Sequence, residues 1–143
     1  MMKIIKTIFI TLILLFSMFR VGFCGGDDEV RVTIAALQQT YFNAVQSQDF
    51  ATAYDMVTEN MRDGRTKEKY VEDWEGVMKQ AQVDLIEGGV TAIDVDGDKA
   101  RVHAWTKASD VFNVIPIIEK EIDHWVLVND VWKLDLTEVL MEE

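Results

Sequence analysis

The sequence predicts an α+β domain in which helices come first and an antiparallel sheet follows, with the helices on one face of the sheet. Three observations carry this prediction. Apolar residues recur every three to four positions between residues 28 and 81, as on the buried face of a helix. From residue 90 onward they alternate in runs that flank two-residue turn signals, as in β-hairpins. Residues 1 to 26 differ from both parts and have the composition of an export signal.

The N-terminal segment has the layout of a signal peptide. Lys3 and Lys6 precede an uncharged, mostly apolar run over residues 7–19, and no acidic residue occurs before residue 27. A helix that spans a bilayer needs about 20 apolar residues, so this run is short for a permanent anchor. We therefore expect an exported protein, with an uncleaved anchor as the alternative.

The end of this segment bears on how the protein is attached. Val21-Gly22-Phe23-Cys24 resembles a bacterial lipobox, in which the cysteine becomes the lipidated first residue, although Phe23 stands where the pattern has a small residue. The alternative is ordinary cleavage after Cys24, which would release a free secreted domain. We expect a signal peptide and lipobox region over 1–24 with lipid on Cys24, a polar tether over 25–28, and one domain in the cell envelope over 29–143.

Charge and cysteine content exclude several classes of function. The chain has 14 Lys and Arg against 25 Asp and Glu, a formal charge of −11. Binding to nucleic acid depends largely on Lys and Arg at phosphates, so we expect no nucleic-acid partner. An acidic surface also repels anionic lipid headgroups, so we expect membrane contact only through the N-terminal anchor. The single cysteine rules out a disulfide framework within one chain.

Three amphipathic helices are expected between residues 28 and 81. Asp27 or Asp28, then Asp49, and then Thr66 can cap their N-termini, and Gly64 ends the second helix. Gln38 falls off the apolar stripe of the first helix. The expected buried residues are Val30, Ile34, Leu37, Tyr41 and Val45 in the first helix, Phe50, Tyr54, Val57 and Met61 in the second, and Tyr70, Trp74, Val77 and Ala81 in the third.

The first hairpin is predicted around Asp96-Gly97, between runs at 90–95 and 100–106. In its second run small apolar residues alternate with larger and more polar ones. We expect the small set, Ala100, Val102 and Ala104, to face the helices, and the alternating set, Arg101, His103 and Trp105, to face outward.

The second hairpin is predicted over residues 117–128 and 131–139, joined at Asn129-Asp130. A two-residue turn pairs Leu127 with Trp132 and Trp125 with Leu134. In this register Leu136 shares the core face, Trp132 is buried, and His124 lies opposite Asp135 on the other face.

Three stretches of this sequence resemble the nuclear transport factor 2-like superfamily, also called cystatin-like or polyketide-cyclase-like. They are residues 41–45 and 49–54 in the first two helices and 125–134 in the last hairpin, and the resemblance covers residues 28 to 140. It implies N-terminal helices packed on a curved antiparallel sheet, a cone-shaped α+β roll that leaves a pocket. Members include isomerases, dehydratases, hydrolases, carrier-like proteins and many exported proteins, so fold alone assigns no chemistry.

The resemblance also indicates where a site would lie, because the enzymes among these proteins use an Asp, Glu or His inside the cone. Here Glu121 and Asp123 alternate in phase with Trp125 and are the candidate catalytic carboxylates, since burial would raise their pKa values. The alternative is that this strand end protrudes into water. The candidate ligand-binding residues are aromatic side chains that are core residues first: Tyr41, Tyr54, Trp74 and Trp125.

Other chemistries lack support in the sequence. No phosphate-binding glycine loop is present, and no Ser or Cys is placed beside a His for nucleophilic catalysis. Residues 94–98 have the acids of a calcium loop but not its length or its closing glutamate. We therefore expect no metal and no cofactor.

These features together predict an exported, lipid-anchored, non-enzymatic binding domain for a small apolar ligand or a protein partner. The alternatives are a proton-transfer enzyme, either an isomerase or a dehydratase, and a structural dimerisation module of the envelope. The uncharged apolar segment at 111–118 lies outside the alternating pattern. We expect it and the outer face of the sheet to support a homodimer, with a flap over the pocket mouth as the alternative.

Overall fold

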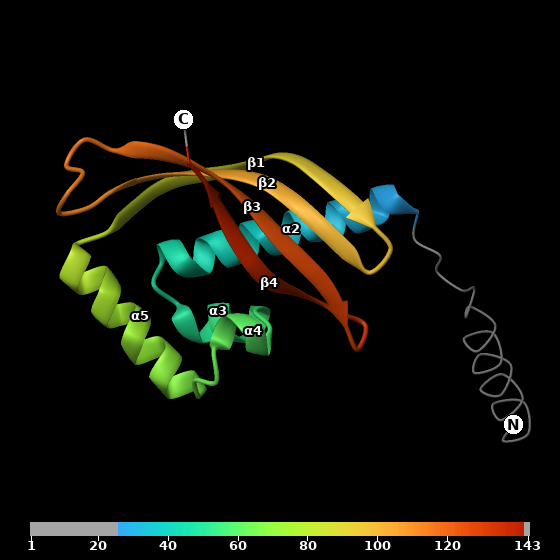
Figure 1. Cartoon of the computed structure of the whole chain (residues 1–143), viewed down its shortest axis with the longest axis horizontal. Helices are drawn as coiled ribbons and strands as arrows, with labels where there is room; N and C mark the ends of the chain where they lie inside the picture. The colour runs from blue at the N-terminus through green and yellow to red at the C-terminus, as the bar shows by residue number, and fades with distance from the viewer. Residues whose placement is uncertain (1–25, 142–143) are drawn as a thin grey trace, which may run out of the picture.

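The protein is described by a computed structural model over residues 26–141, and the expectations for the signal peptide and for lipid on Cys24 lie outside these residues. Helices come first and strands follow, as the sequence predicts (Figure 1). None of the helices in this part of the chain is long and apolar enough to span a membrane. The elements are α2 (Asp27–Gln46), α3 (Phe50–Met56), α4 (Glu59–Arg62), α5 (Lys67–Ala81), β1 (Asp84–Asp96), β2 (Lys99–Ser109), β3 (Ile117–Val128) and β4 (Val131–Leu140).

The helix starts follow the predicted caps with one correction. Asp49 accepts a hydrogen bond from the Thr52 amide at 3.1 Å, and Thr66 accepts one from the Lys69 amide at 3.3 Å. The first helix instead starts after Gly26, and no side chain caps it. Asp27 and Asp28 therefore lie in its first turn, where their negative charge still favours the helix dipole.

The predicted second helix is wrong, because this segment forms two short helices separated by two extended residues, Val57 and Thr58. Val57 has extended backbone geometry and forms a parallel bridge to Leu134 of β4. The amide of Thr58 donates to the Leu134 carbonyl at 2.9 Å. A contact with the last strand, remote in the sequence, thus interrupts a segment whose periodicity is helical throughout.

The strands form one antiparallel sheet in the order β1-β2-β3-β4, and α2 lies along one face of it (Figure 1). The first hairpin turns where predicted, but β1 starts at Asp84, six residues before the predicted run. Ala100, Val102 and Ala104 are buried, so the prediction that they face the helices is confirmed.

The second hairpin confirms two predicted pairs and corrects a third. Leu127 lies opposite Trp132 and Trp125 lies opposite Leu134, but His124 lies opposite Leu136 and not Asp135. A β-bulge causes the change, since it leaves one extra residue on β4 between these pairs.

The bulged residue, Asp135, is held by the short helix α4 and the residue before it. Thr58 donates from its hydroxyl to the Asp135 carboxylate at 2.6 Å, and the Asn60 amide donates to the Asp135 carbonyl at 2.9 Å. Beyond the bulge the alternation of β4 is reversed. Leu136 is therefore on the solvent side and 42% exposed, contrary to the prediction that it shares the core face.

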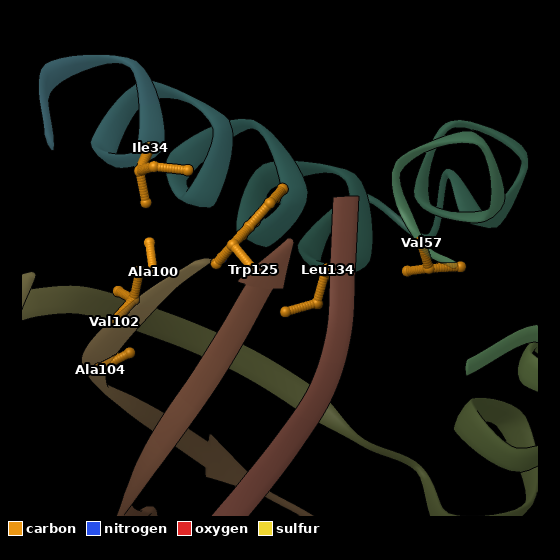
Figure 2. Packing of buried hydrophobic residues seen from close by; sticks show 7 residues of the cluster. All are labelled: Ile34, Val57, Ala100, Val102, Ala104, Trp125 and Leu134. Carbon is orange, nitrogen blue, oxygen red and sulfur yellow. The ribbon is translucent and has the colours of Figure 1, made fainter. Parts of the chain in front are cut away.

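The main core lies between α2 and the sheet, where Trp125 points from β3 toward the helix (Figure 2). Trp132 is only partly buried at the edge of this core. The fully or nearly fully buried apolar members of the core are Ile34, Val57, Ala100, Val102, Ala104, Trp125 and Leu134.

A second, smaller core joins α3 to α5 and consists of Phe50, Tyr70 and Met78. The expected buried face of α5 is therefore rotated. Met78 takes a buried place, whereas Trp74 and Val77 are 37% and 50% exposed. The reason is that α5 packs mainly on α3, so only a narrow stripe of it is covered.

Candidate functional site

The polar group at the centre of the domain is the carboxylate of Asp123, which is 1% exposed. Gln38 of α2 donates from Nε2 to Asp123 Oδ2 at 2.6 Å, and the Thr137 hydroxyl of β4 donates to Oδ1. Trp125 donates from Nε1 to Gln38 Oε1 at 2.8 Å. Gln38 thus bridges the carboxylate and the indole, and both oxygens of Asp123 have a donor.

The inward orientation of Asp123 follows the predicted alternation with Trp125, but the role of Gln38 was not predicted. The sequence placed Gln38 off the apolar stripe, whereas the structure buries it to 5% exposure. Gln38 lies four residues after Ile34, which is one turn of helix along the same face. That spacing is the signal that could have found it.

Glu121 lies two residues before Asp123 on the same face of β3 and is half-buried. Burial, together with the neighbouring charges of Asp123 and Glu119, raises its pKa to about 7. Burial also raises the pKa of Asp123, while the hydrogen bonds from Thr137 and Gln38 oppose this rise. Both inward carboxylates are therefore harder to ionise than ordinary surface acids.

Tyr41 of α2 belongs to the same cluster. Burial raises the pKa of its phenol, and the nearby side chains of Tyr70, Asp123 and Glu121 raise it further. The structure therefore brings together four of the residues singled out from the sequence, namely Tyr41, Glu121, Asp123 and Trp125.

Tyr54 and Trp74 do not join this cluster. Tyr54 meets the ring of Tyr70 edge-on at 5.4 Å, and the Arg62 guanidinium lies 4.2 Å from the centre of its ring. Trp74 stacks on Phe50 with ring centres 6.2 Å apart. Both residues therefore pack α3 against α5 and do not line the space between α2 and the sheet.

That space is almost completely filled. A cavity of about 20 Å³ remains between α2 and the sheet, and Gln38, Phe42, Gly88 and Glu121 are among the residues that line it. Phe42 lies directly against Gly88 at this hollow, because a Cβ placed on Gly88 would come within 2.3 Å of the phenyl ring. About one water molecule fits in a space of this size. The cone is therefore occupied by its own side chains.

The face of the sheet turned away from α2, here called the outer face, is more open. It carries hollows of about 640 and 360 Å³. Residues that line the first include Asp94, Lys99, Arg101, His124, Val126 and Leu136, and residues that line the second include Thr91, His103, Trp105, Ile118, Lys120, Leu140 and the candidate carboxylate Glu121.

Acidic and basic side chains alternate across the outer face. Asp94 Oδ2 lies 3.2 Å from His103 Nε2 and 3.8 Å from Arg101 Nη2. His124 Nε2 lies 3.3 Å from Glu138 Oε2. Over residues 26–141, no group of three or more His, Cys, Asp or Glu side chains is arranged to hold a metal ion.

A family comparison agrees with this architecture. The model of the NTF2-like N-terminal transpeptidase domain matches residues 35–106, slightly more than half of the chain and from α2 into β2. The chain belongs to this family. The NTF2-like resemblance seen in the sequence is thereby confirmed. NTF2-like folds occur in ligand-binding proteins and in some enzymes, so membership alone assigns no chemistry. None of the curated proteins matches the chain.

Solved structures support the same fold at low sequence identity. An NTF2-like protein from Cytophaga hutchinsonii is 14% identical, with a TM-score of 0.56 over 78% of this chain and 98% of that chain. A protein with a cystatin-like fold from Nostoc punctiforme is 12% identical, with a TM-score of 0.57 over 76% and 88%. A protein from Rhodopseudomonas palustris that contains a SEC-C motif is 14% identical, with a TM-score of 0.59 over 74% and 77%.

Proposed function

We propose that this NTF2-like chain is an exported, lipid-anchored, non-enzymatic binding domain whose partner docks on the outer face of the sheet, and that this partner is a second copy of the chain. The observation that carries the proposal is the filled interior. The inward carboxylate of Asp123 is 1% exposed, and the hollow that Glu121 borders between α2 and the sheet holds only about 20 Å³.

The filled interior argues against the two functions that need a pocket. A small apolar ligand requires a cavity of several hundred Å³. A proton-transfer enzyme requires a carboxylate within hydrogen-bond reach of its substrate. Gln38 and Thr137 already occupy both oxygens of Asp123, and on the helix side of the sheet Glu121 borders a hollow of only about 20 Å³.

The outer face favours a second copy because it carries both signs of charge. A two-fold interface brings the same surface patch together twice, so that patch must be self-complementary. Asp94 and Glu138 supply acids beside Arg101 and His124, and Leu136, opposite His124 on β4, is an exposed apolar residue. The two hollows make the outer face concave, so that side chains of a second copy can pack into it.

Export rests on the N-terminal sequence. Lys3 and Lys6 before an uncharged apolar run favour secretion, and Cys24 offers a site for lipid.

The dimer is tested by sedimentation of the chain purified in detergent, at low and at moderate salt. We expect a dimer that strengthens with salt, because the formal charge of −11 opposes association. Leu136→Asp should give a monomer, whereas Val77→Asp, at an equally exposed apolar site on α5, should leave the dimer intact. A wild-type monomer at high protein concentration in both salts would refute the dimer.

Lipid attachment is tested by fractionation of cells that express the full chain. Cys24→Ala should move the protein from the detergent-extracted membrane fraction to the soluble fraction, because several acyl chains bind a bilayer firmly. Cys24→Ser should behave in the same way. Unchanged fractionation of both variants would show that the apolar segment itself is the anchor.

A further inference from the structure

The connection between β2 and β3 presents apolar side chains to solvent. It projects from the end of the sheet that lies far from residue 26 (Figure 1). Phe112, Val114 and Ile115 are 88%, 83% and 82% exposed. No charged residue occurs from Val111 to Ile118. Single exposed apolar residues are common on protein surfaces, but an uncharged cluster of this kind marks an interaction site.

Hydrogen bonds hold the connection in a defined conformation, unlike a mobile flap. Asp110 accepts hydrogen bonds at Oδ1 from the amides of Phe112 and Asn113, at 2.7 and 2.8 Å. The Asp110 amide donates to the Asn113 carbonyl at 3.0 Å. The Val111 amide donates to the Ala81 carbonyl at the end of α5 at 2.9 Å. The side chains at 112, 114 and 115 are thus held outward, which differs from a flap that closes a pocket with its apolar groups inside.

The hydrogen bonds of this turn determine how much of it can enter a bilayer. Inside a bilayer each unpaired backbone N–H costs several kcal/mol, because no water is present to accept from it. The N–H groups of residues 110 to 113 are paired within the domain and Pro116 has no N–H, whereas those of Val114 and Ile115 have no partner among the described residues. The side chains of the tip, and not its backbone, are therefore the part that can enter hydrocarbon. The side chain of Asn113 is also engaged, since its amide nitrogen lies 3.3 Å from each oxygen of Asp110.

We propose that the tip of this turn, formed by Phe112, Val114 and Ile115, inserts into the outer layer of a lipid bilayer. A protein partner is less well matched, because protein interfaces carry about one hydrogen bond per 100–200 Å² and the tip offers no free polar side chain. A bilayer can also surround a projecting turn from all sides.

The negative charge of the domain indicates which lipid headgroups the tip can approach. Asp110 and Glu119 flank the tip, and the chain carries a formal charge of −11. Anionic headgroups would repel it, so the tip should prefer a zwitterionic surface. This is a second membrane contact, in addition to the N-terminal anchor expected from the sequence, and it does not depend on the proposed dimer.

The test uses the full chain with Cys24→Ser, so that one introduced cysteine carries an environment-sensitive fluorophore. The label is placed at Ile115→Cys or, as the control, at Val131→Cys, an exposed apolar position at the start of β4. Vesicles of phosphatidylcholine with brominated acyl chains then report insertion by quenching. Both proteins contain the same N-terminal segment, so a difference between them reports the tip alone.

We expect quenching at position 115 and none at position 131, with weaker quenching when phosphatidylglycerol replaces part of the lipid. Phe112→Asp in the 115-labelled chain should weaken the effect roughly tenfold or more, in line with the burial of one large apolar side chain. Because Phe112 is exposed, the variant should unfold at the wild-type temperature. Equal signals at the two positions, or none at 115, would overturn the proposal. Shielding of position 115 that grows with protein concentration without lipid would show that a second copy covers the tip.

Discussion

Gln38 and Asp123, 85 residues apart in the chain, meet at 2.6 Å in the centre of the domain. The contact joins the first helix to the third strand and leaves a carboxylate almost without solvent. A buried carboxylate is costly unless donors surround it, so this pair fixes how α2 lies on the sheet. The same glutamine accepts the indole N–H of Trp125, which couples the polar pair to the apolar core.

Replacement of Gln38 by Ala should therefore destabilise the domain by about 2–4 kcal/mol, because the Trp125 N–H and one oxygen of Asp123 would lose their partner. Urea unfolding measures this loss. The matched control is Gln39→Ala, since Gln39 is exposed and should change stability by less than about 0.5 kcal/mol. Equal effects of the two substitutions would contradict a central role for Gln38.

Local patterns in the sequence predicted most of the fold. The alternation on β2 placed Ala100 and Val102 inside, and the Asn129-Asp130 turn fixed the pairs around Trp125. Such features depend on neighbouring residues or on one turn. Two features were mispredicted, namely where β1 starts and which face of α5 is buried. Both depend on the surface that each element packs against, and no local sequence pattern carries that information.

The site was predicted only in part, for the same reason. Alternation allowed Asp123 and Glu121 to point inward, with a strand end that protrudes into water as the alternative, and in the structure Asp123 is buried and Glu121 half-buried. The bulge at Asp135 was not predictable, because its cause is a pair of hydrogen bonds from Thr58 and Asn60, more than 70 residues earlier. The filled cavity was also missed, because it depends on Phe42 resting over a glycine on β1.

Phe42→Ala should open the closed interior and create a site for a small apolar molecule. Removal of a partly buried phenyl ring leaves a cavity with apolar walls, and such cavities bind benzene. The expected result is a rise in melting temperature with added benzene for the variant and none for the wild type. Phe112→Ala is the control, because it removes the same side chain from an exposed position. A benzene-dependent rise in the wild type would mean that the interior is already open.

Thr58 and Asp135 should be energetically coupled, because their hydrogen bond of 2.6 Å ties the start of α4 to the bulge of β4. Each single substitution by Ala should cost about 1–2 kcal/mol. The double variant should cost less than the sum, with a coupling of about 1 kcal/mol. A double-mutant cycle by urea unfolding measures this value. Strict additivity would show that the bulge is set by the strand alone.

Glu121→Gln should remove a pH dependence of stability. Burial beside Asp123 and Glu119 raises the folded-state pKa of Glu121 from 4.5 to about 7. The folded protein therefore holds this proton more tightly than the unfolded chain, so the contribution to stability is fully present below pH 4.5 and is lost as the pH rises toward about 7. In thermal unfolding, the wild type should lose stability relative to Glu121→Gln between pH 5 and pH 8, the range that spans this shifted pKa. Glu75→Gln, on the exposed surface of α5, should follow the wild type across the range. Parallel curves for the wild type and Glu121→Gln would show that Glu121 is solvated and that the end of β3 protrudes into water.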